Sequence, residues 1–340
     1  MLKHFIFTII LLVIYFLSWA QFKKRLDYDT TYYRSFKGTI ITRIFFARDY
    51  DVFKMKPPGG AQPLTYHANT SLNLGVGLTY RSFFISVSKG LNFLQSDQTK
   101  GPTNSLSIAA HLYRRKWVID ALALFNKGYY LTPHGLGSPD GQTYYKRPDL
   151  NIQIAGASVY RVLNSERFSY GAGLSQNAWQ QKSAGSFLVG VQAFYAATHS
   201  DSALAPTKVD TLFDQLGIHT LHCLEIGPGV GYAYTFVYDK NYFLLGSLNL
   251  NCNLSYSREL GKSDAGKITI SPNYSFRIGA GYNTARWGAS LSWLAGEMNS
   301  AGESSGYRYR FTSGSYRLIY ARRIAINRQM RKILESGSEK

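Results

Sequence analysis

The sequence predicts an all-β fold: an antiparallel transmembrane β-barrel of about 12 strands, range 10–14, after an N-terminal signal peptide. Three observations carry this prediction. Apolar and polar residues alternate with a period of two along most of the chain. The apolar face is bulky while the polar face is small and rich in glycine. The N-terminus is that of an exported protein.

The segment SLNLGVGLTY, residues 71–80, shows the alternation clearly. Successive side chains of a strand point to opposite faces, so Leu72, Leu74 and Val76 share one face with Leu78 and Tyr80. The other face carries only serine, asparagine, glycine and threonine. A wall with lipid outside and water inside needs this pattern, and the 26 tyrosines and 20 phenylalanines suit its two aromatic girdles.

The first twenty residues predict secretion. A short basic start, Met1–His4, is followed by an apolar run from Phe5 to Leu17 and by Ser18-Trp19-Ala20. This arrangement favours a signal peptide over residues 1–20, cleaved after Ala20. The alternative, a retained anchor helix, is disfavoured because the run is shorter than the ~20 residues of a spanning helix. An exported chain of amphipathic strands is expected in the Gram-negative outer membrane.

The expected domain organisation follows from the strand pattern. After the signal peptide we expect a periplasmic N-terminal segment over 21–37, an outer-membrane barrel over 38–322 and a basic periplasmic tail over 323–340. The expected strands are 38–49, 69–80, 82–92, 103–115, 117–129, 149–162, 167–179, 185–198, 220–237, 242–257, 268–283, 287–297 and 305–322. Tight turns alternate with long connections, as in barrels whose short turns face the periplasm.

Thirteen segments do not close a barrel of even strand number. The last segment changes face midway, which indicates either a bulge or a hairpin turning at 312–315, and the hairpin would give fourteen strands. Alternatively, residues 38–49 leave the wall and twelve strands remain.

The two cysteines are expected to be free thiols. The alternation places Cys223 inward and Cys252 outward, and side chains on opposite faces of one sheet cannot form a disulfide.

The net charge of +18 raises the question of anionic partners. Nucleic acid is excluded because no reading motif accompanies the charge and the chain is exported. The expected partners are outer-membrane lipid with lipopolysaccharide, and the outer-membrane assembly machinery. No cofactor is expected.

Searches for catalytic and metal motifs predict a protein that is not an enzyme. His219 and His222 are three residues apart, which places them on opposite faces of a strand and argues against a zinc site. The Gly-x-Gly motifs at 75–77, 229–231 and 279–281 lie within strands, where no phosphate loop forms. The enzymatic alternative is an outer-membrane lipid-acting hydrolase, but no GxSxG motif is present and His111 faces inward, away from lipid.

One stretch resembles a known family. The sequence NSERFSYGAGLSQNAWQQKSAGSFLVG (164–190), with KGYYL (127–131) and YDTTYY (28–33), is similar to a family of Bacteroidetes proteins defined only as a domain of unknown function. The resemblance covers nearly the whole mature chain. It implies an outer-membrane β-barrel and transfers no catalytic or binding residue.

The polar residues expected to face the lumen are the remaining functional lead. By parity they are Arg43, Asn73, His111, Asp120, Asn126, Gln192, Glu225, Arg277 and Arg308. Such residues line a narrow transport pore, or they pair across the lumen in a structural or secretion-associated barrel. A soluble periplasmic or surface β-protein is the third hypothesis.

Overall fold

The computed structural model describes residues 28–36, 38–80, 82–91, 97–213, 217–261, 266–303 and 306–326. The predicted signal peptide at 1–20 lies outside these residues, as does residue 327 onward of the predicted tail.

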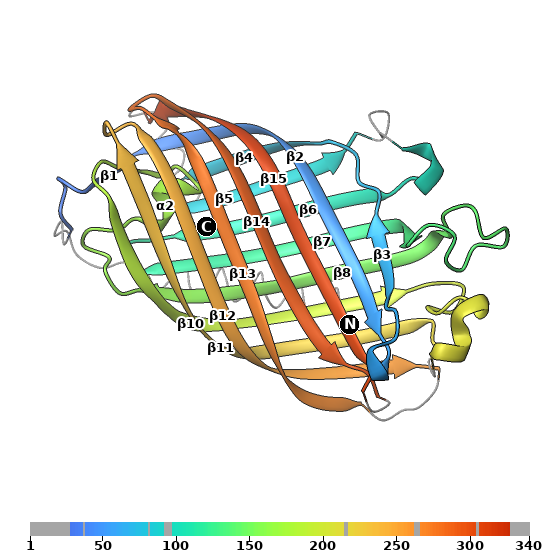
Figure 1. Ribbon diagram of the computed structural model, residues 1–340. Helices are drawn as coiled ribbons and strands as arrows, with labels where there is room; N and C mark the ends of the chain where they lie inside the picture. The colour runs from blue at the N-terminus through green and yellow to red at the C-terminus, as the bar shows by residue number, and fades with distance from the viewer. Residues whose placement is uncertain are drawn as a thin grey trace, which may run out of the picture.

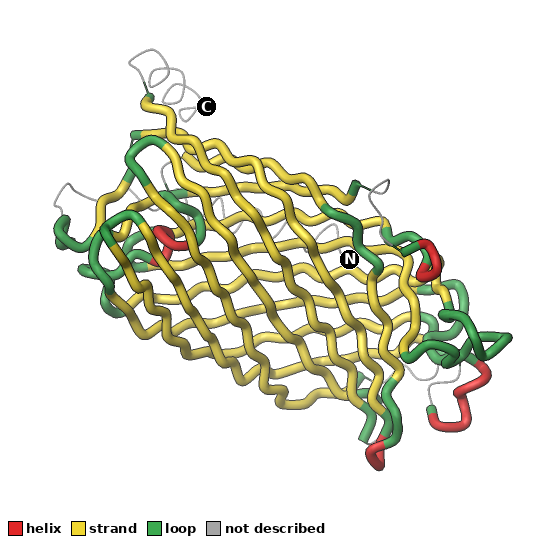
Figure 2. The backbone as a smooth tube through the Cα atoms, turned by 45° about the horizontal axis from the view of Figure 1, so that its top comes forward, coloured by secondary structure: helices red, strands yellow, loops and turns green. Residues whose placement is uncertain are grey.

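Twelve antiparallel strands form a closed ring (Figure 1). Strand β15 pairs with β2 along its whole length, and this pairing closes the cylinder. The wall strands are β2 (Thr39–Lys56), β4 (Asn73–Tyr80), β5 (Phe83–Gly90), β6 (Asn104–Tyr113), β7 (Trp117–Thr132), β8 (Lys146–Val162), β10 (Ala184–His199), β11 (Thr220–Tyr238), β12 (Tyr242–Leu260), β13 (Lys267–Asn283), β14 (Trp287–Ala301) and β15 (Arg308–Ala325). Figure 2 shows the strands crossing the cylinder at a tilt, as closure of a barrel requires.

The two ends of the barrel differ in their connections. Four short connections, which join β4 to β5, β6 to β7, β11 to β12 and β13 to β14, lie at one end, which we call the short-turn end. The opposite end, the long-loop end, carries the connections that contain the short 3-10 helices η1 (Pro58–Gly60), η3 (Gln98–Lys100) and η4 (Thr207–Leu212). None of the helices in the described part of the chain is long and apolar enough to cross a bilayer.

A short extra strand, β3 (Leu64–Ala68), narrows the barrel toward the long-loop end. It continues the line of β4 along β2 and pairs directly with β7, beyond the point where the β5–β6 hairpin stops. Strand β3 therefore replaces β4, β5 and β6 there, and the ring falls from twelve strands to ten. Gly128 lies at this junction with φ of 97°, and a Cβ atom there would come within 2.3 Å of the Pro102 carbonyl oxygen, so only glycine fits.

The predicted number of about twelve strands is confirmed, but one of the predicted wall strands is wrong. Residues 38–49 do belong to the wall, in β2, and the predicted strand 167–179 is the segment outside it. That segment forms α2 (Tyr170–Gly173) and β9 (Ala178–Gln180), and β9 pairs with β1 (Tyr33–Ser35) inside the short-turn end. Its apolar residues are buried by the lumen and not by lipid.

The last strand is neither bulged nor a hairpin. The pairing of β15 with β2 keeps one register from Arg308 to Ala325. Tyr309 and Phe311 point inward while Tyr316 and Leu318 point outward. The apolar pattern changes face because the barrel interior is itself apolar near the long-loop end.

The outer surface carries a continuous apolar belt. Leu74 and Leu248 are 40% and 48% exposed, and the indole of Trp293 lies on the same outer face, stacked on Tyr316. No second protein layer covers this belt in the described residues. A closed sheet with its apolar side chains turned outward leaves no edge and needs lipid around it, so the chain is an integral β-barrel of the outer-membrane type.

The cysteine prediction is confirmed. Cys223 on β11 is buried, Cys252 on β12 is exposed, and both are free thiols.

Candidate functional site

The lumen holds most of the polar residues that the sequence singled out. Arg43, Asn73, His111, Asp120, Asn126, Gln192, Glu225 and Arg277 lie on the inward face of their strands. Arg308 does not: it is exposed on the outer face at the start of β15. Its parity was assigned from Tyr307, Tyr309 and Phe311 as lipid-facing residues, whereas these three aromatic rings are buried inside the barrel.

An ion-pair network crosses the lumen around Asp120 on β7. The carboxylate accepts hydrogen bonds from the Tyr113 hydroxyl (2.6 Å) and contacts His111 Nδ1 (2.5 Å), both from β6. The Arg277 guanidinium on β13 lies 2.8 Å from its other oxygen and also donates to the hydroxyl of Tyr170 (2.9 Å). Because Tyr170 belongs to α2, this network joins two walls of the barrel to the segment inside it.

Two neighbouring carboxylates on β2 form a second polar group. Asp49 accepts hydrogen bonds from Asn73 (2.6 Å) and Ser107 (3.1 Å) through one oxygen, and Asp51 accepts one from Asn126. Each keeps a second buried oxygen without a hydrogen-bond donor among the described residues. The two side chains have the same parity as Arg43. Asp49 is the last residue of the predicted strand 38–49, and extending that strand by two residues would also have identified Asp51.

A third group lies between β11 and β13. Glu225 accepts hydrogen bonds from Asn253 (3.2 Å) and from Asn273, and all three side chains are almost fully buried. Hydrogen bonds from two amides offset the free-energy cost of burying this carboxylate, a cost that a carboxylate without partners would bear in full. Asn253 and Asn273 were not among the predicted lumen residues, although both share the inward parity of their strands.

The short-turn end of the lumen is closed by residues 28–36 and 164–183, which we call the inner plug. Phe168 and Tyr170 of this plug are buried against the wall residues Leu188, Ala233 and Leu245. The β1–β9 pairing holds its two pieces together.

Arg323, near the end of β15, fastens the inner plug to the wall. Its guanidinium donates to Gln176 O (3.1 Å), Thr284 O (2.9 Å) and Asn283 Oδ1 (2.7 Å), and it lies over the Phe36 ring at 4.2 Å. The sequence analysis placed Arg323 in the basic tail, but the strand continues past it because its side chain is bound inside the barrel.

The long-loop end is closed by apolar packing. Inward aromatic and aliphatic side chains of β2, β3, β7, β8 and β15 meet Leu204, Phe213 and Ile218 of the 200–219 loop, and these three residues are 0–2% exposed. Arg147 anchors the same loop by donating to Ala203 O (2.8 Å) and Ser202 O (3.0 Å). The assumption of a wet inner face throughout therefore fails at this end of the barrel.

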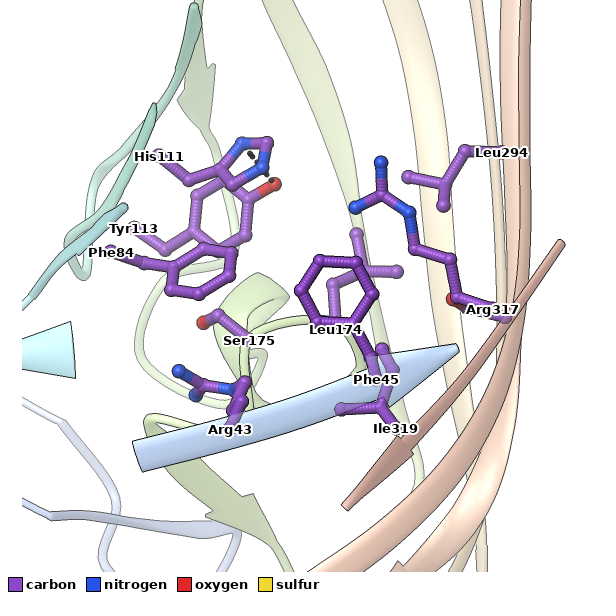
Figure 3. A pocket seen from close by; sticks show the side chains of 11 residues that line it. Arg43, Phe45, Phe84, His111, Tyr113, Leu174, Ser175, Leu294, Arg317 and Ile319 are labelled. Carbon is purple, nitrogen blue, oxygen red and sulfur yellow. Dashed lines mark hydrogen bonds between the residues drawn. The ribbon is translucent and has the colours of Figure 1, made fainter. Parts of the chain in front are cut away.

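Between these closures, the described residues line at least two cavities. The smaller, about 30 Å³, lies beside the inner plug. Arg43 and Arg317 both line it, and Figure 3 shows them on β2 and β15 with Leu174 and Ser175 of the inner plug nearby. His111, Leu294 and Arg317 line both cavities and so form the constriction between them.

The larger cavity, about 170 Å³, occupies the middle of the lumen, and we call it the lumen cavity. Its apolar lining includes Leu122, Leu124 and Phe311. Its polar lining consists of Asp49, Asp51, Ser107, His111, Asp120, Ser158, Gln192, Asn273, Ser275, Glu297, Ser313, Ser315, Arg277 and Arg317. The arrangement fits one small molecule with an apolar body and a hydrogen-bonding head.

No group of three or more metal-ligating side chains occurs in the described residues. His222 lies on the outer face of β11, where its ring nitrogen meets the Tyr195 hydroxyl at 2.5 Å, and His219 lies in the preceding loop. His111, which a lipid hydrolase would need on the lipid side, is inside the lumen.

Comparison with solved structures finds outer-membrane barrels. The translocator domain of autotransporter NalP from Neisseria meningitidis is 10% identical, with a TM-score of 0.42, and the match covers 83% of this chain and 89% of that one. An outer membrane channel from Pseudomonas putida F1 is 11% identical, with a TM-score of 0.37 and coverage of 85% and 96%. A Pseudomonas aeruginosa FadL homologue is 8% identical, with a TM-score of 0.26 and coverage of 85% and 91%.

These likenesses are too distant to add to the barrel assignment, which rests on the closed sheet and its apolar belt. No curated protein matches the sequence. The family model described as Domain of unknown function (DUF4421) matches residues 27–321, and the chain belongs to that family.

Proposed function

We propose that this protein is a gated outer-membrane barrel that admits one small amphiphilic molecule at a time and has no permanently open channel. The observation that carries the proposal is the lumen cavity of about 170 Å³, which lies between the inner plug and the apolar packing of the long-loop end. A cavity of about 150 Å³ with apolar walls holds a benzene-sized molecule. The polar residues that line the lumen cavity select for a head group that forms hydrogen bonds.

The proposal is non-enzymatic. Asp120 is held by Tyr113, His111 and Arg277, and the Arg277 bond to Tyr170 ties this cluster to the inner plug. These side chains therefore fix the closed state and line the cavity, which are roles that a transporter needs and a surface hydrolase does not.

The placement of the chain in the membrane is part of the same proposal. Short turns face the periplasm in barrels of this type, so the short-turn end with the inner plug would be periplasmic. The signal peptide 1–20 would be removed, and the tail would stay on the periplasmic side. We also propose that the outer-membrane assembly machinery inserts the barrel, because its polar lumen must close as its apolar belt enters lipid.

A basic cluster on the outer face favours lipopolysaccharide as the lipid partner. Arg308 lies directly opposite Lys56, and Arg310 lies opposite Lys54, across the β15–β2 ladder. Like charges opposite each other destabilise a sheet, and Glu297, 3.3 Å from Arg310, offsets only part of this repulsion. Phosphate groups of lipopolysaccharide at this height would neutralise the rest.

Two measurements on purified protein test the transport proposal. In planar bilayers the wild-type protein should show no steady open conductance, and a stable open channel would refute the closed state. In nanodiscs it should bind 3-fluorophenol, a benzene-sized ring with one hydroxyl, as followed by ¹⁹F NMR. Leu122→Trp, which fills the lumen cavity, should abolish binding. Leu106→Trp, on the outer face of β6, is the matched control and should retain it.

A further inference from the structure

The ladder between β13 and β14 stops before either strand ends. Its last pair is Tyr274 with Glu297. Beyond it, β13 continues to pair with β12 as far as Lys267, and β14 continues to pair with β15 as far as Ala301. Residues 267–273 of β13 and 298–301 of β14 are therefore not paired with each other, in a stretch of wall that the structure describes fully. Pro272 lies in this stretch, as expected for a residue with no backbone N–H to donate.

Side chains hold this break closed. The backbone N–H of Asn299 donates to Asn273 Oδ1 (3.0 Å). The Asn299 side-chain amide donates to Pro272 O (3.1 Å) and to Glu297 Oε1 (2.9 Å). We call Asn273 and Asn299 the amide latch. Side-chain hydrogen bonds release by rotation about χ angles, whereas a backbone ladder opens only when several bonds break together.

The tip of β14 also crosses behind β13 instead of meeting its edge. Ser300 Oγ lies 2.9 Å from Ser255 Oγ on β12, and Ala301 O accepts from Ser257. Residues two strands apart are therefore in direct contact through the inner face of the wall. The wall overlaps here, and an overlap can slide apart while the remaining ladders stay intact.

The lumen cavity reaches the break. Its lining includes Asn273, Tyr274 and Ser275 from β13 and Gly296, Glu297 and Met298 from β14. Tyr274 and Glu297 belong to the outward face, while Ser275 and Met298 belong to the inward face. Residues of both faces border one cavity at the point where pairing ends.

The outer side of the break has an apolar border and a polar one. Ile268 and Ile270 on β13 are 64% and 74% exposed. On β14 and β15 the border consists of Glu297 and Arg310, 3.3 Å apart, with Asn299 bonded to both side chains. A molecule with an apolar body and a polar head can contact the apolar border with its body and the polar border with its head. The lumen cavity offers the same two kinds of surface.

We propose that the break between β13 and β14 is a lateral exit, through which a small amphiphile passes between the lumen cavity and the surrounding lipid when the amide latch opens. This inference rests on the proposed function, because it requires the lumen cavity to hold such a molecule. It adds the route: the molecule leaves sideways through the wall, and the inner plug stays in place.

A disulfide across the overlap tests the lateral exit. Ser255→Cys with Ser300→Cys replaces two hydroxyls 2.9 Å apart, on a Cys223→Ala, Cys252→Ser background that removes the native thiols. The exchange rate of 3-fluorophenol in nanodiscs should fall about tenfold or more on oxidation and recover on reduction. Ala233→Cys with Ser247→Cys bridges a pair within the intact β11–β12 ladder and should leave exchange unchanged.

A second variant acts in the opposite direction. Asn299→Ala removes the latch amide, and exchange should become about tenfold faster, because the bonds lost are of ordinary side-chain strength. If 3-fluorophenol binds but its exchange is the same in oxidised and reduced protein, the molecule leaves through an end of the barrel and the lateral exit is refuted. If 3-fluorophenol does not bind in either state, the proposed function itself fails.

Discussion

Arg323→Ala is expected to release the inner plug while leaving the barrel closed as a cylinder. Arg323 contacts the plug in two ways, through its hydrogen bond to Gln176 O and through the Phe36 ring beneath its guanidinium. Its other two bonds, to Thr284 O and Asn283 Oδ1, lie within the wall. The substitution therefore acts mainly on how the plug is docked.

The expected magnitude follows from these two contacts. A hydrogen bond from a charged donor contributes about 1.5–3 kcal/mol. A partly desolvated cation–π contact contributes about 0.5–2 kcal/mol. Their loss should weaken plug docking by about 3 kcal/mol, which corresponds to a roughly hundredfold larger undocked fraction.

Two assays measure that fraction. In planar bilayers, Arg323→Ala should show open-channel events that wild type lacks. In detergent, chymotrypsin should cut at Phe168 and Tyr170, which are 0% and 2% exposed in the docked plug. Arg322→Ala is the matched control, because this neighbour on β15 points outward and does not touch the plug. A shift in electrophoretic mobility on heating shows that the barrel of a variant is folded. If folded Arg323→Ala shows neither open-channel events nor cleavage by chymotrypsin, the assignment of Arg323 as the plug anchor is refuted.

Three further outcomes follow from the structure. Lipopolysaccharide should raise the melting temperature more than neutral phospholipid does, and the double variant Lys54→Ala, Arg308→Ala should reduce this difference. Arg286→Ala, at the short-turn end, should leave the difference unchanged. If both variants reduce the difference equally, the basic cluster is not the contact for lipopolysaccharide. Gly75→Ala should lower the free energy of unfolding by about 1–3 kcal/mol, because its new Cβ would lie 2.1 Å from the Phe45 ring. Gly246→Ala, with open space around it, should be neutral, and equal effects in urea titrations would contradict this packing. A water-soluble maleimide should label neither cysteine in the folded protein, because Cys252 faces lipid and Cys223 is buried in the lumen; early labelling of Cys223 would show that the lumen is open.

The inward parity of single residues was predictable from the sequence wherever the alternation ran unbroken. Asn73 and Glu225 were assigned inward because leucine or isoleucine flanks each of them on both sides. Arg308 was misplaced for the same reason that the last strand seemed to change face: apolar residues were taken to face lipid, and here they fill the lumen. Which partners these side chains meet across the barrel was beyond the sequence, because Asp120 and Arg277 are 157 residues apart and meet only when the ring closes.

The position of the inner plug inside the barrel was also not predictable from the sequence. The segment 167–179 has strand-like alternation, and nothing local separates a strand in the wall from a segment inside it. Its burial against Leu188 and Leu245, and its pairing with β1, depend on contacts that form only after the cylinder is closed.

By itself, the sequence determined an antiparallel barrel with an apolar exterior, its approximate strand number and its two separate thiols, because side chains alternate between faces and each of these features follows from that local rule. Only the tertiary structure decided what fills the barrel, where β3 narrows it and where the β13–β14 ladder breaks. Those features depend on which distant strands become neighbours, and that is fixed by closure of the whole sheet and not by any one segment.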